Sequence, residues 1–128
     1  MKKGLLIFTI SGITIYWILV FSGIFPVDET VPGYKNWFMS FPIADGWIAC
    51  AAGLTLFNQK SQPRIAAIYQ SAAGSGLLFL GLYALLYGIN TGLLCNLTPD
   101  EVIEILIKVY CLTVGAYFII DAKKEVMN

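Results

Sequence analysis

The stretch EVIEILIKVYCLTVGAYFII, residues 101–120, is long and apolar enough to cross a lipid bilayer, although it carries two glutamates and a lysine. A hydrocarbon core of about 30 Å requires about 20 mostly apolar residues in helical conformation. Three further windows of this kind occur along the chain, and together they predict an all-α integral membrane four-helix bundle. The helices are expected at about residues 4–25, 38–57, 64–89 and 99–121.

The composition favours the same class. Of the 128 residues, 58% are hydrophobic and 12% are charged, and the mean hydropathy is +0.75. So few polar side chains cannot cover a soluble globule. A net charge of zero without a basic run gives no reason to expect nucleic acid as a partner. We therefore expect a single transmembrane domain over residues 1–128 that has the lipid bilayer as its surroundings.

The N-terminal sequence Met1-Lys2-Lys3, followed by an apolar stretch, resembles a secretory signal peptide. However, the stretch exceeds the usual apolar region of about 7–15 residues. It also lacks a clear small-x-small cleavage site before Pro26. We expect an uncleaved first helix.

Basic residues predict the orientation, because they concentrate on the cytoplasmic side of membrane spans. In a four-span protein, both termini and the loop between the second and third helices lie on one side. We expect an up-down-up-down bundle in a prokaryotic cytoplasmic (inner) membrane, with both termini in the cytoplasm. That side holds Lys2, Lys3, Lys60, Arg64, Lys123 and Lys124, whereas the predicted outer segments hold Lys35.

Helix starts are marked by proline and a capping pattern. In Thr98-Pro99-Asp100-Glu101, the threonine hydroxyl can accept a backbone N–H, proline suits the first turn, and Glu101 can bond back to residue 98. The fourth helix is therefore predicted to begin near Pro99. Pro42 and Pro63 suit the first turns of the second and third helices for the same reason.

The third predicted helix carries a small residue at every seventh position: Ala67, Gly74, Gly81 and Gly88. This spacing keeps small side chains along one side of the helix, where a neighbouring backbone can approach closely. We interpret the stripe as packing within one bundle. Homodimerisation is the alternative.

Charged residues share a face of the fourth helix. At about 100° per residue, Glu101, Glu104, Lys108 and Cys111 fall within one sector. Glu104 precedes Lys108 by four residues, the favourable order for an ion pair within a helix. Asp45, on a face of small side chains in the second helix, is placed to reach Lys108 from a neighbouring span. The sequence predicts an outer-half cluster of Asp45, Glu104 and Lys108.

Two roles are open for this cluster. It could fix helix register as a structural ion pair, or it could bind an ion, a proton or a polar ligand reached from outside, since ionisable groups within membranes are often functional. Four further residues are candidates for lining the same outer cavity. They are Tyr16, Tyr83, Tyr87 and Asn90.

The sequence gives little support for catalysis, a cofactor or a metal site. It has no histidine, which removes imidazole acid-base chemistry and the usual zinc and haem ligands. Cys50, Cys95 and Cys111 show no paired spacing. We expect buried thiols at Cys50 and Cys111, a free thiol at Cys95, no catalytic residues and no enzyme activity.

Three segments carry a resemblance to a known family. They are FPIADGWIACAAGL (41–54), GLLFLGLYALLYGINTGLL (76–94) and the opening stretch. In this order they resemble an uncharacterised family of small prokaryotic four-span membrane proteins, whose pattern Pro42, Asp45 and Asn90-Thr91-Gly92 match. Ala84 stands where the pattern has a second acidic residue, which argues against a shared two-carboxylate site. The resemblance implies the fold and brings no known activity.

We therefore expect a small multi-pass membrane protein that binds a ligand, lipid or partner through its outer-half polar cluster. One alternative is a small ion or solute transporter or channel that uses Asp45 and Lys108, in oligomeric form. Another is an accessory subunit of a larger membrane complex, which would explain the lack of catalytic residues without any pocket.

Overall fold

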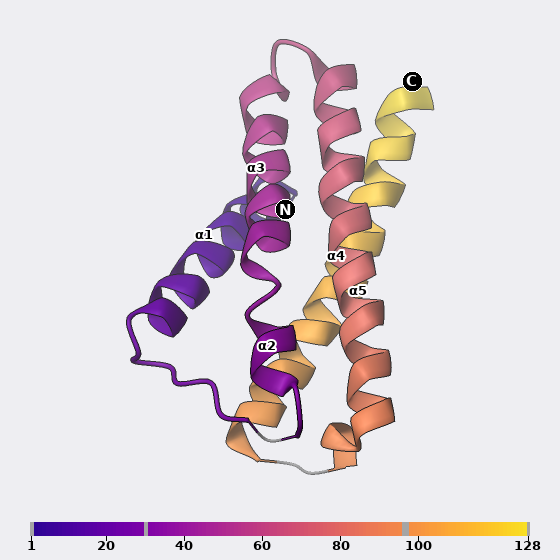
Figure 1. Cartoon of the computed structure of the whole chain (residues 1–128). Helices are drawn as coiled ribbons and strands as arrows, with labels where there is room; N and C mark the ends of the chain where they lie inside the picture. The colour runs from indigo at the N-terminus through magenta and orange to yellow at the C-terminus, as the bar shows by residue number, and fades with distance from the viewer. Residues whose placement is uncertain (1, 30, 96–97, 128) are drawn as a thin grey trace.

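The computed structural model describes residues 2–29, 31–95 and 98–127, and this part of the chain is helical without strands (Figure 1). Four of its segments are long and apolar enough to cross a membrane, as predicted. The second of these segments combines two helices, α2 and α3. The elements are α1 (Lys2–Phe21), α2 (Tyr34–Phe38), α3 (Pro42–Asn58), α4 (Pro63–Thr91), the 3₁₀ turn η1 (Leu93–Cys95) and α5 (Pro99–Met127).

The predicted helix starts agree with the structure at the prolines. Pro42, Pro63 and Pro99 each lie in the first turn of a long helix. At the start of α5, the Thr98 hydroxyl accepts the backbone N–H of Glu101 at 3.2 Å, which is the predicted cap. The reverse half of the capping box is absent, because the Glu101 carboxylate instead contacts Lys108.

Helix ends differ from the prediction. α1 ends at Phe21 rather than at residue 25, because Gly23 adopts a left-handed conformation with φ +83° that only glycine accommodates easily. The helix predicted from residue 38 is interrupted at residues 39–41, so that α2 is separate from α3. α4 and α5 both extend beyond their predicted C-terminal ends, and each has 29 residues.

The closest approach in the fold is the seam between α4 and α5. A Cβ atom built on Gly74 would lie 2.7 Å from the Gly115 backbone oxygen, and one on Gly115 would lie 2.8 Å from the Gly74 oxygen. On Gly81 it would meet the Leu112 side chain at 3.0 Å. Apolar attraction is weak between helices surrounded by lipid, so such close van der Waals contact is a main source of helix association.

α3 packs on the other side of α4. A Cβ atom on Gly76 would lie 2.8 Å from the Ile48 side chain, so a small residue is needed there as well. Behind these contacts lies a continuous apolar core shared by α1, α3, α4 and α5. Its buried members are Leu6, Ile48, Ala51, Ala52, Ala73, Leu77, Cys111, Val114 and Phe118.

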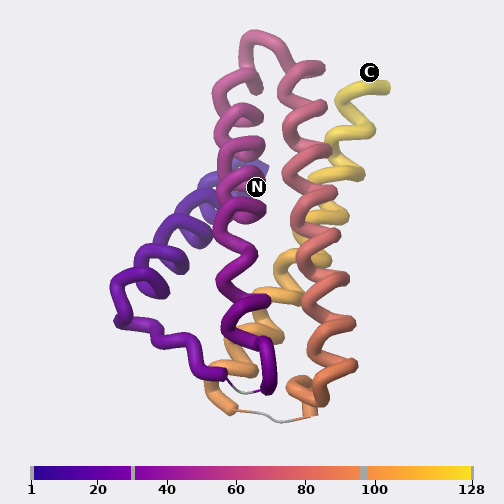
Figure 2. Tube along the Cα trace, in the orientation of Figure 1, coloured from indigo at the N-terminus to yellow at the C-terminus, as the bar shows by residue number. Residues whose placement is uncertain are grey.

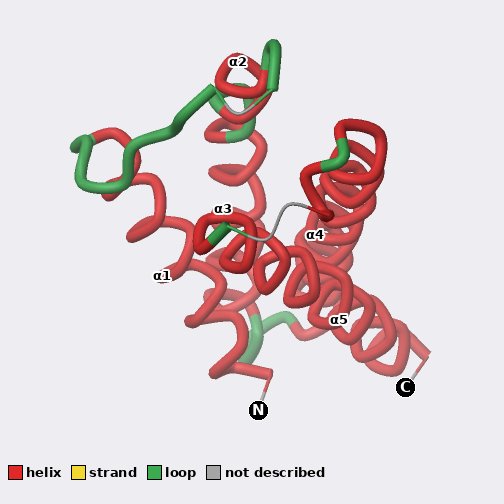
Figure 3. Tube along the Cα trace, turned by 90° about the horizontal axis from the view of Figure 1, so that it is seen from below, coloured by secondary structure: helices red, strands yellow, loops and turns green. Residues whose placement is uncertain are grey.

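α1 diverges from the other helices. Figure 2 shows its C-terminal end, near Phe21, lying apart from α4 and α5, and the view from below in Figure 3 shows the same separation. Its backbone contacts that of α3, whereas long side chains reach across to α5. At its N-terminal end the Lys2 ammonium contacts the Asp121 carboxylate at 3.0 Å.

The outer surface of the helices is strongly apolar. Large hydrophobic side chains point outward along all four long helices, as expected for a surface in contact with lipid tails. Examples that are more than half exposed are Ile15, Ile18, Phe57, Ile68, Phe79 and Ile120.

Candidate functional site

The space between the helices is a cavity of about 440 Å³. Small residues such as Gly12 and Ala84 leave parts of its wall without large side chains. The remaining wall is mostly apolar and aromatic. It includes Phe8, Ile13, Trp37, Phe38, Phe41, Leu77, Leu80, Ile103, Leu106 and Ile107.

Two carboxylates lie at the cavity, and each accepts a hydrogen bond from α1. The Trp17 indole N–H donates to Asp45 Oδ2 at 2.6 Å, and the Tyr16 hydroxyl donates to Glu104 Oε1 at 2.8 Å. Asp45 is in the first turn of α3, where the positive end of the helix dipole favours a negative charge. The two donors are neutral, so neither hydrogen bond cancels the charge of an ionised carboxylate.

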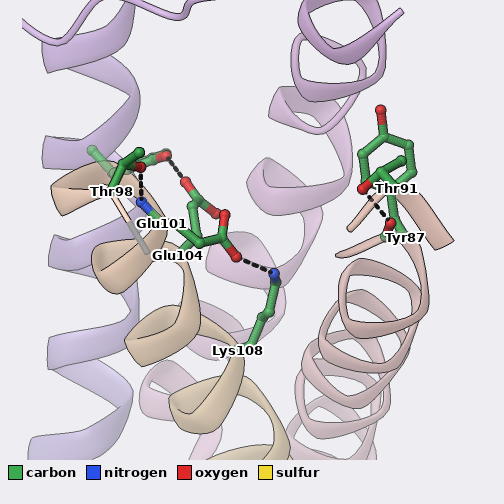
Figure 4. A network of polar contacts seen from close by, with 7 residues as sticks. Tyr87, Thr91, Thr98, Glu101, Glu104 and Lys108 are labelled. Atoms are coloured by element: carbon green, nitrogen blue, oxygen red, sulfur yellow. Dashed lines mark hydrogen bonds and ion pairs between the residues drawn. The ribbon is translucent and has the colours of Figure 1, made fainter. Parts of the chain in front are cut away.

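Lys108 also reaches the cavity, but its ion-pair partner differs from the predicted one. Its ammonium contacts Glu101 Oε1 at 3.4 Å, and the two side chains are only 10% and 8% exposed (Figure 4). Glu101 lies two helical turns before Lys108 on the same face of α5. A Cβ atom on Gly88 would lie 3.2 Å from the lysine nitrogen, so this glycine gives the ammonium room against α4.

This arrangement corrects the predicted pairing within the Asp45, Glu104 and Lys108 cluster. All three residues line one cavity, but neither carboxylate forms an ion pair with the lysine. Tyr16 takes the place of Lys108 at Glu104, and Trp17 takes its place at Asp45. Adjacent residues of α1 therefore supply one hydrogen-bond donor to α3 and one to α5.

A smaller pocket of about 180 Å³ adjoins the cavity and is called the acidic vestibule here. It shares Tyr16, Phe38 and Glu104 with the cavity. Its wall consists of the chain after α1, the start of α5 and nearby side chains, and its described lining residues carry carboxylates without a lysine or arginine. The carboxylates belong to Asp28, Asp100, Glu101 and Glu104.

Three of the four predicted cavity residues lie elsewhere. The rings of Tyr83 and Tyr87 stack on Trp37 with centroid distances of 6.2 and 3.9 Å, outside the cavity lining. Asn90 is exposed and also lies outside it. Tyr16 is the one predicted tyrosine at the cavity. Because α2 folds against α4, Trp37 separates the two α4 tyrosines from the space that they were expected to line.

The predicted stripe on α4 is buried. Gly74, Gly81 and Gly88 face α5, as their contacts show, and Ala67 is 2% exposed. Gly76 lies on another side of α4 and faces α3. All of these positions contact neighbouring helices of the same chain or are buried by them.

Several residues at the site were missed by sequence reasoning. Trp17 adjoins the predicted Tyr16, and Thr9 shares the same helical face through a seven-residue spacing. The Thr9 and Tyr110 hydroxyls lie 2.7 Å apart and provide another polar link between α1 and α5. The sequence pattern that could have predicted this link is the spacing of Thr9, Ile13 and Tyr16. Intervals of four and three residues place their side chains on one face of α1.

The cysteines show no sign of joint chemistry. All three are free; Cys111 is buried at the cavity, whereas Cys95 and Cys50 are exposed, which corrects the predicted burial of Cys50. Within the described ranges, no group of three or more Cys, Asp or Glu residues is placed to hold a metal ion. The residues that line the cavity offer hydrogen bonds, charge and apolar contact.

Comparison of the chain with models of protein families, with curated proteins and with solved structures finds no match. The site itself combines a half-open, mostly apolar cavity with two carboxylates, a buried ion pair and several rings. Such a combination suits the binding of a molecule that is mostly apolar and has one polar group.

Proposed function

We propose that this chain is a multi-pass membrane protein that binds an amphipathic small molecule or lipid in the cavity between α1, α3, α4 and α5. The observation that carries this proposal is the cavity of about 440 Å³ with Asp45 and Glu104 at its wall. Sites for small molecules commonly have volumes of about 300–1,000 Å³, mostly apolar walls and a few polar groups that fix orientation. The proposed function is binding rather than catalysis.

The membrane arrangement that goes with this function is an up-down-up-down bundle in a prokaryotic cytoplasmic membrane. Lys60 in the α3–α4 connection and Lys123 near the end of α5 support cytoplasmic termini through the preference of basic residues for that side. The acidic vestibule would then open on the outer side. A ligand would reach Glu104 from that side or from the lipid between α1 and α5.

Energetics favour a ligand at this site over an empty space. A charged side chain at the centre of a membrane costs at least about 2.5–3.5 kcal/mol unless it finds a partner or water. Asp45 and Glu104 each have one neutral donor, and a carboxylate can accept several hydrogen bonds. A ligand whose polar group contacts these oxygens would add the missing partners while its apolar part fills the cavity.

A transporter is the second candidate, because the cavity adjoins the acidic vestibule and the two share Tyr16, Phe38 and Glu104 as wall residues. Transport requires a second opening toward the opposite side, reached by a conformational change or an oligomeric assembly. Flux into liposomes that Asp45→Asn abolishes would support transport. Binding without flux would leave the protein as a binding module or an accessory subunit.

Native mass spectrometry of the gently solubilised protein tests the binding function. Ala84→Leu should fill part of the cavity and remove a bound small molecule that the wild type retains. Ala44→Leu is the matched control, because Ala44 is exposed on α3 and does not line the cavity. Equal bound mass in the wild type and both variants would contradict ligand binding at this site.

A further inference from the structure

We infer, on the basis of the ligand-binding function proposed above, that the cavity takes a lipophilic organic cation: a largely apolar molecule with one ammonium-type or phosphonium-type charge. The charge of the groups that face the cavity carries this step. Asp45 and Glu104 line it, and their assigned hydrogen-bond donors are the neutral side chains of Trp17 and Tyr16. An ionised carboxylate with a neutral donor still attracts a cation.

Lys108 is the one basic residue among the described residues that line the cavity. Its ammonium is directed to Glu101, on the vestibule side, and both side chains of this pair are buried. Figure 4 shows the lysine nitrogen pointing to the Glu101 carboxylate, with Glu104 beside it. Because Glu101 compensates this positive charge, the carboxylates of Asp45 and Glu104 dominate the charge that a ligand would meet.

Aromatic rings lie next to the two carboxylates at the cavity. Tyr16, Trp17 and Phe38 all line the cavity, and their centroids are 5.5–6.1 Å apart in pairs. Tyr16 and Trp17 are the same residues that donate to the two carboxylates. Ring faces attract cations, most strongly when the site excludes water. Carboxylates and rings together are the recognition chemistry of an alkylammonium-type ion.

The acidic vestibule adds selection by charge. It meets the cavity at Tyr16, Phe38 and Glu104, and three of the four carboxylates in its described lining lie outside the Glu101–Lys108 ion pair. A pocket lined by charges of one sign raises the local concentration of counter-ions. A ligand with a phosphate or carboxylate head would be repelled at the vestibule, and Asp45 and Glu104 would repel it again inside the cavity. The same groups would attract a cation.

Binding of two ions of the same shape and opposite charge tests this inference. Tetraphenylphosphonium and tetraphenylborate are titrated into the full-length protein in a neutral detergent, with micelles alone as the reference, by isothermal calorimetry. We expect the phosphonium to bind at least tenfold more tightly than the borate. Replacing Asp45→Asn and Glu104→Gln together should reduce this ratio to near one, and each single variant should reduce it in part.

The ratio of two affinities measured on one sample does not depend on the fraction of correctly folded protein, so partial misfolding of a variant does not mimic the expected result. Glu125→Gln is the matched control, because Glu125 lies near the end of α5, away from the residues lining the cavity and vestibule, and it should leave the ratio unchanged. A ratio that survives the double substitution would overturn the inference.

Failure of the inference and failure of the proposed function give different results. If both ions bind equally and Ala84→Leu abolishes both, the cavity binds apolar molecules without choosing the sign of charge, and the cation inference is wrong. If neither ion binds, the cation inference is also wrong, while native mass spectrometry still decides whether another molecule is bound. Preference for the borate would overturn it as well.

Discussion

Two pairs of helices are held together in different ways. α4 and α5 meet in a seam of direct backbone contact, whereas α1 and α5 are joined by side chains that span a gap. At the seam, Gly74 and Gly115 bring the backbones so close that a single added methyl group would collide with a carbonyl oxygen. Across the gap, the connection is made by side chains that span the distance, such as Tyr16 to Glu104 and Thr9 to Tyr110. The α4–α5 interface leaves no room between the backbones, whereas the α1–α5 interface borders the cavity.

This difference indicates how the molecule divides scaffold from site. Tight van der Waals contact gives a rigid pair of helices, since protein interiors resist small changes of volume. A helix tied by a few hydrogen bonds can move more easily and leaves room for a ligand. We therefore expect substitutions at the seam to change stability, and substitutions at the gap to change ligand binding with smaller effects on stability.

The largest loss of stability is expected for Lys108→Met, at the end of the seam. The substitution leaves Glu101 buried without its ion-pair partner, and breaking a buried pair in this way costs about 3–5 kcal/mol. The free energy of unfolding is measured by adding SDS to mixed micelles and recording helix content by circular dichroism.

A double variant and a surface variant test whether the loss comes from the unpaired buried charge. Lys108→Met combined with Glu101→Gln removes both charges and should recover much of the loss. Lys2→Met breaks the more exposed pair with Asp121 and should cost no more than about 1 kcal/mol. Equal losses for Lys2→Met and Lys108→Met would show that the Glu101–Lys108 pair does not stabilise the seam.

The next effect is expected at the glycines of the seam. Gly74→Ala should lower the free energy of unfolding by about 3 kcal/mol, the upper end of the usual cost of overpacking, because the new methyl group meets the backbone of Gly115. Gly53→Ala is the control on α3, where an added Cβ meets nothing within 4 Å. It should be neutral or gain up to about 1 kcal/mol from helix propensity. The same SDS titration distinguishes the two.

The smallest effect on stability is expected where α1 lines the cavity. Trp17→Phe keeps a ring in place but removes the donor to Asp45, which should cost about 1 kcal/mol, as interhelical hydrogen bonds in membranes do. Trp37→Phe removes no hydrogen bond, because the buried Trp37 N–H has no partner among the described residues. The loss of a hydrogen bond should therefore lower the free energy of unfolding for Trp17→Phe and not for Trp37→Phe. Calorimetry with tetraphenylphosphonium should show weaker binding for Trp17→Phe. A stability loss as large as that of Gly74→Ala would contradict the division into scaffold and site.

Local features of the helices could be read from the sequence, whereas contacts between helices could be read only in part. Thr98 and Pro99 predict the start of α5, because capping depends on residues adjacent in the chain. The seven-residue stripe predicts a close-packed face on α4, because small side chains permit close approach whatever the partner is. In contrast, Tyr87 was assigned to the cavity from its helix alone, and the folding of α2 against α4 placed Trp37 on it.

By itself, the sequence determined that the chain has four long apolar segments, that two of the helices begin near Pro63 and Pro99, and that acidic and basic groups share a face of α5. Only the tertiary structure decided that Lys108 pairs with Glu101, that Tyr16 and Trp17 reach the other carboxylates, and that a cavity lies among them. The physical reason is that helical periodicity fixes the direction of a side chain around its own axis. The distance and tilt between helices depend on all of their contacts at once, and those decide which groups meet.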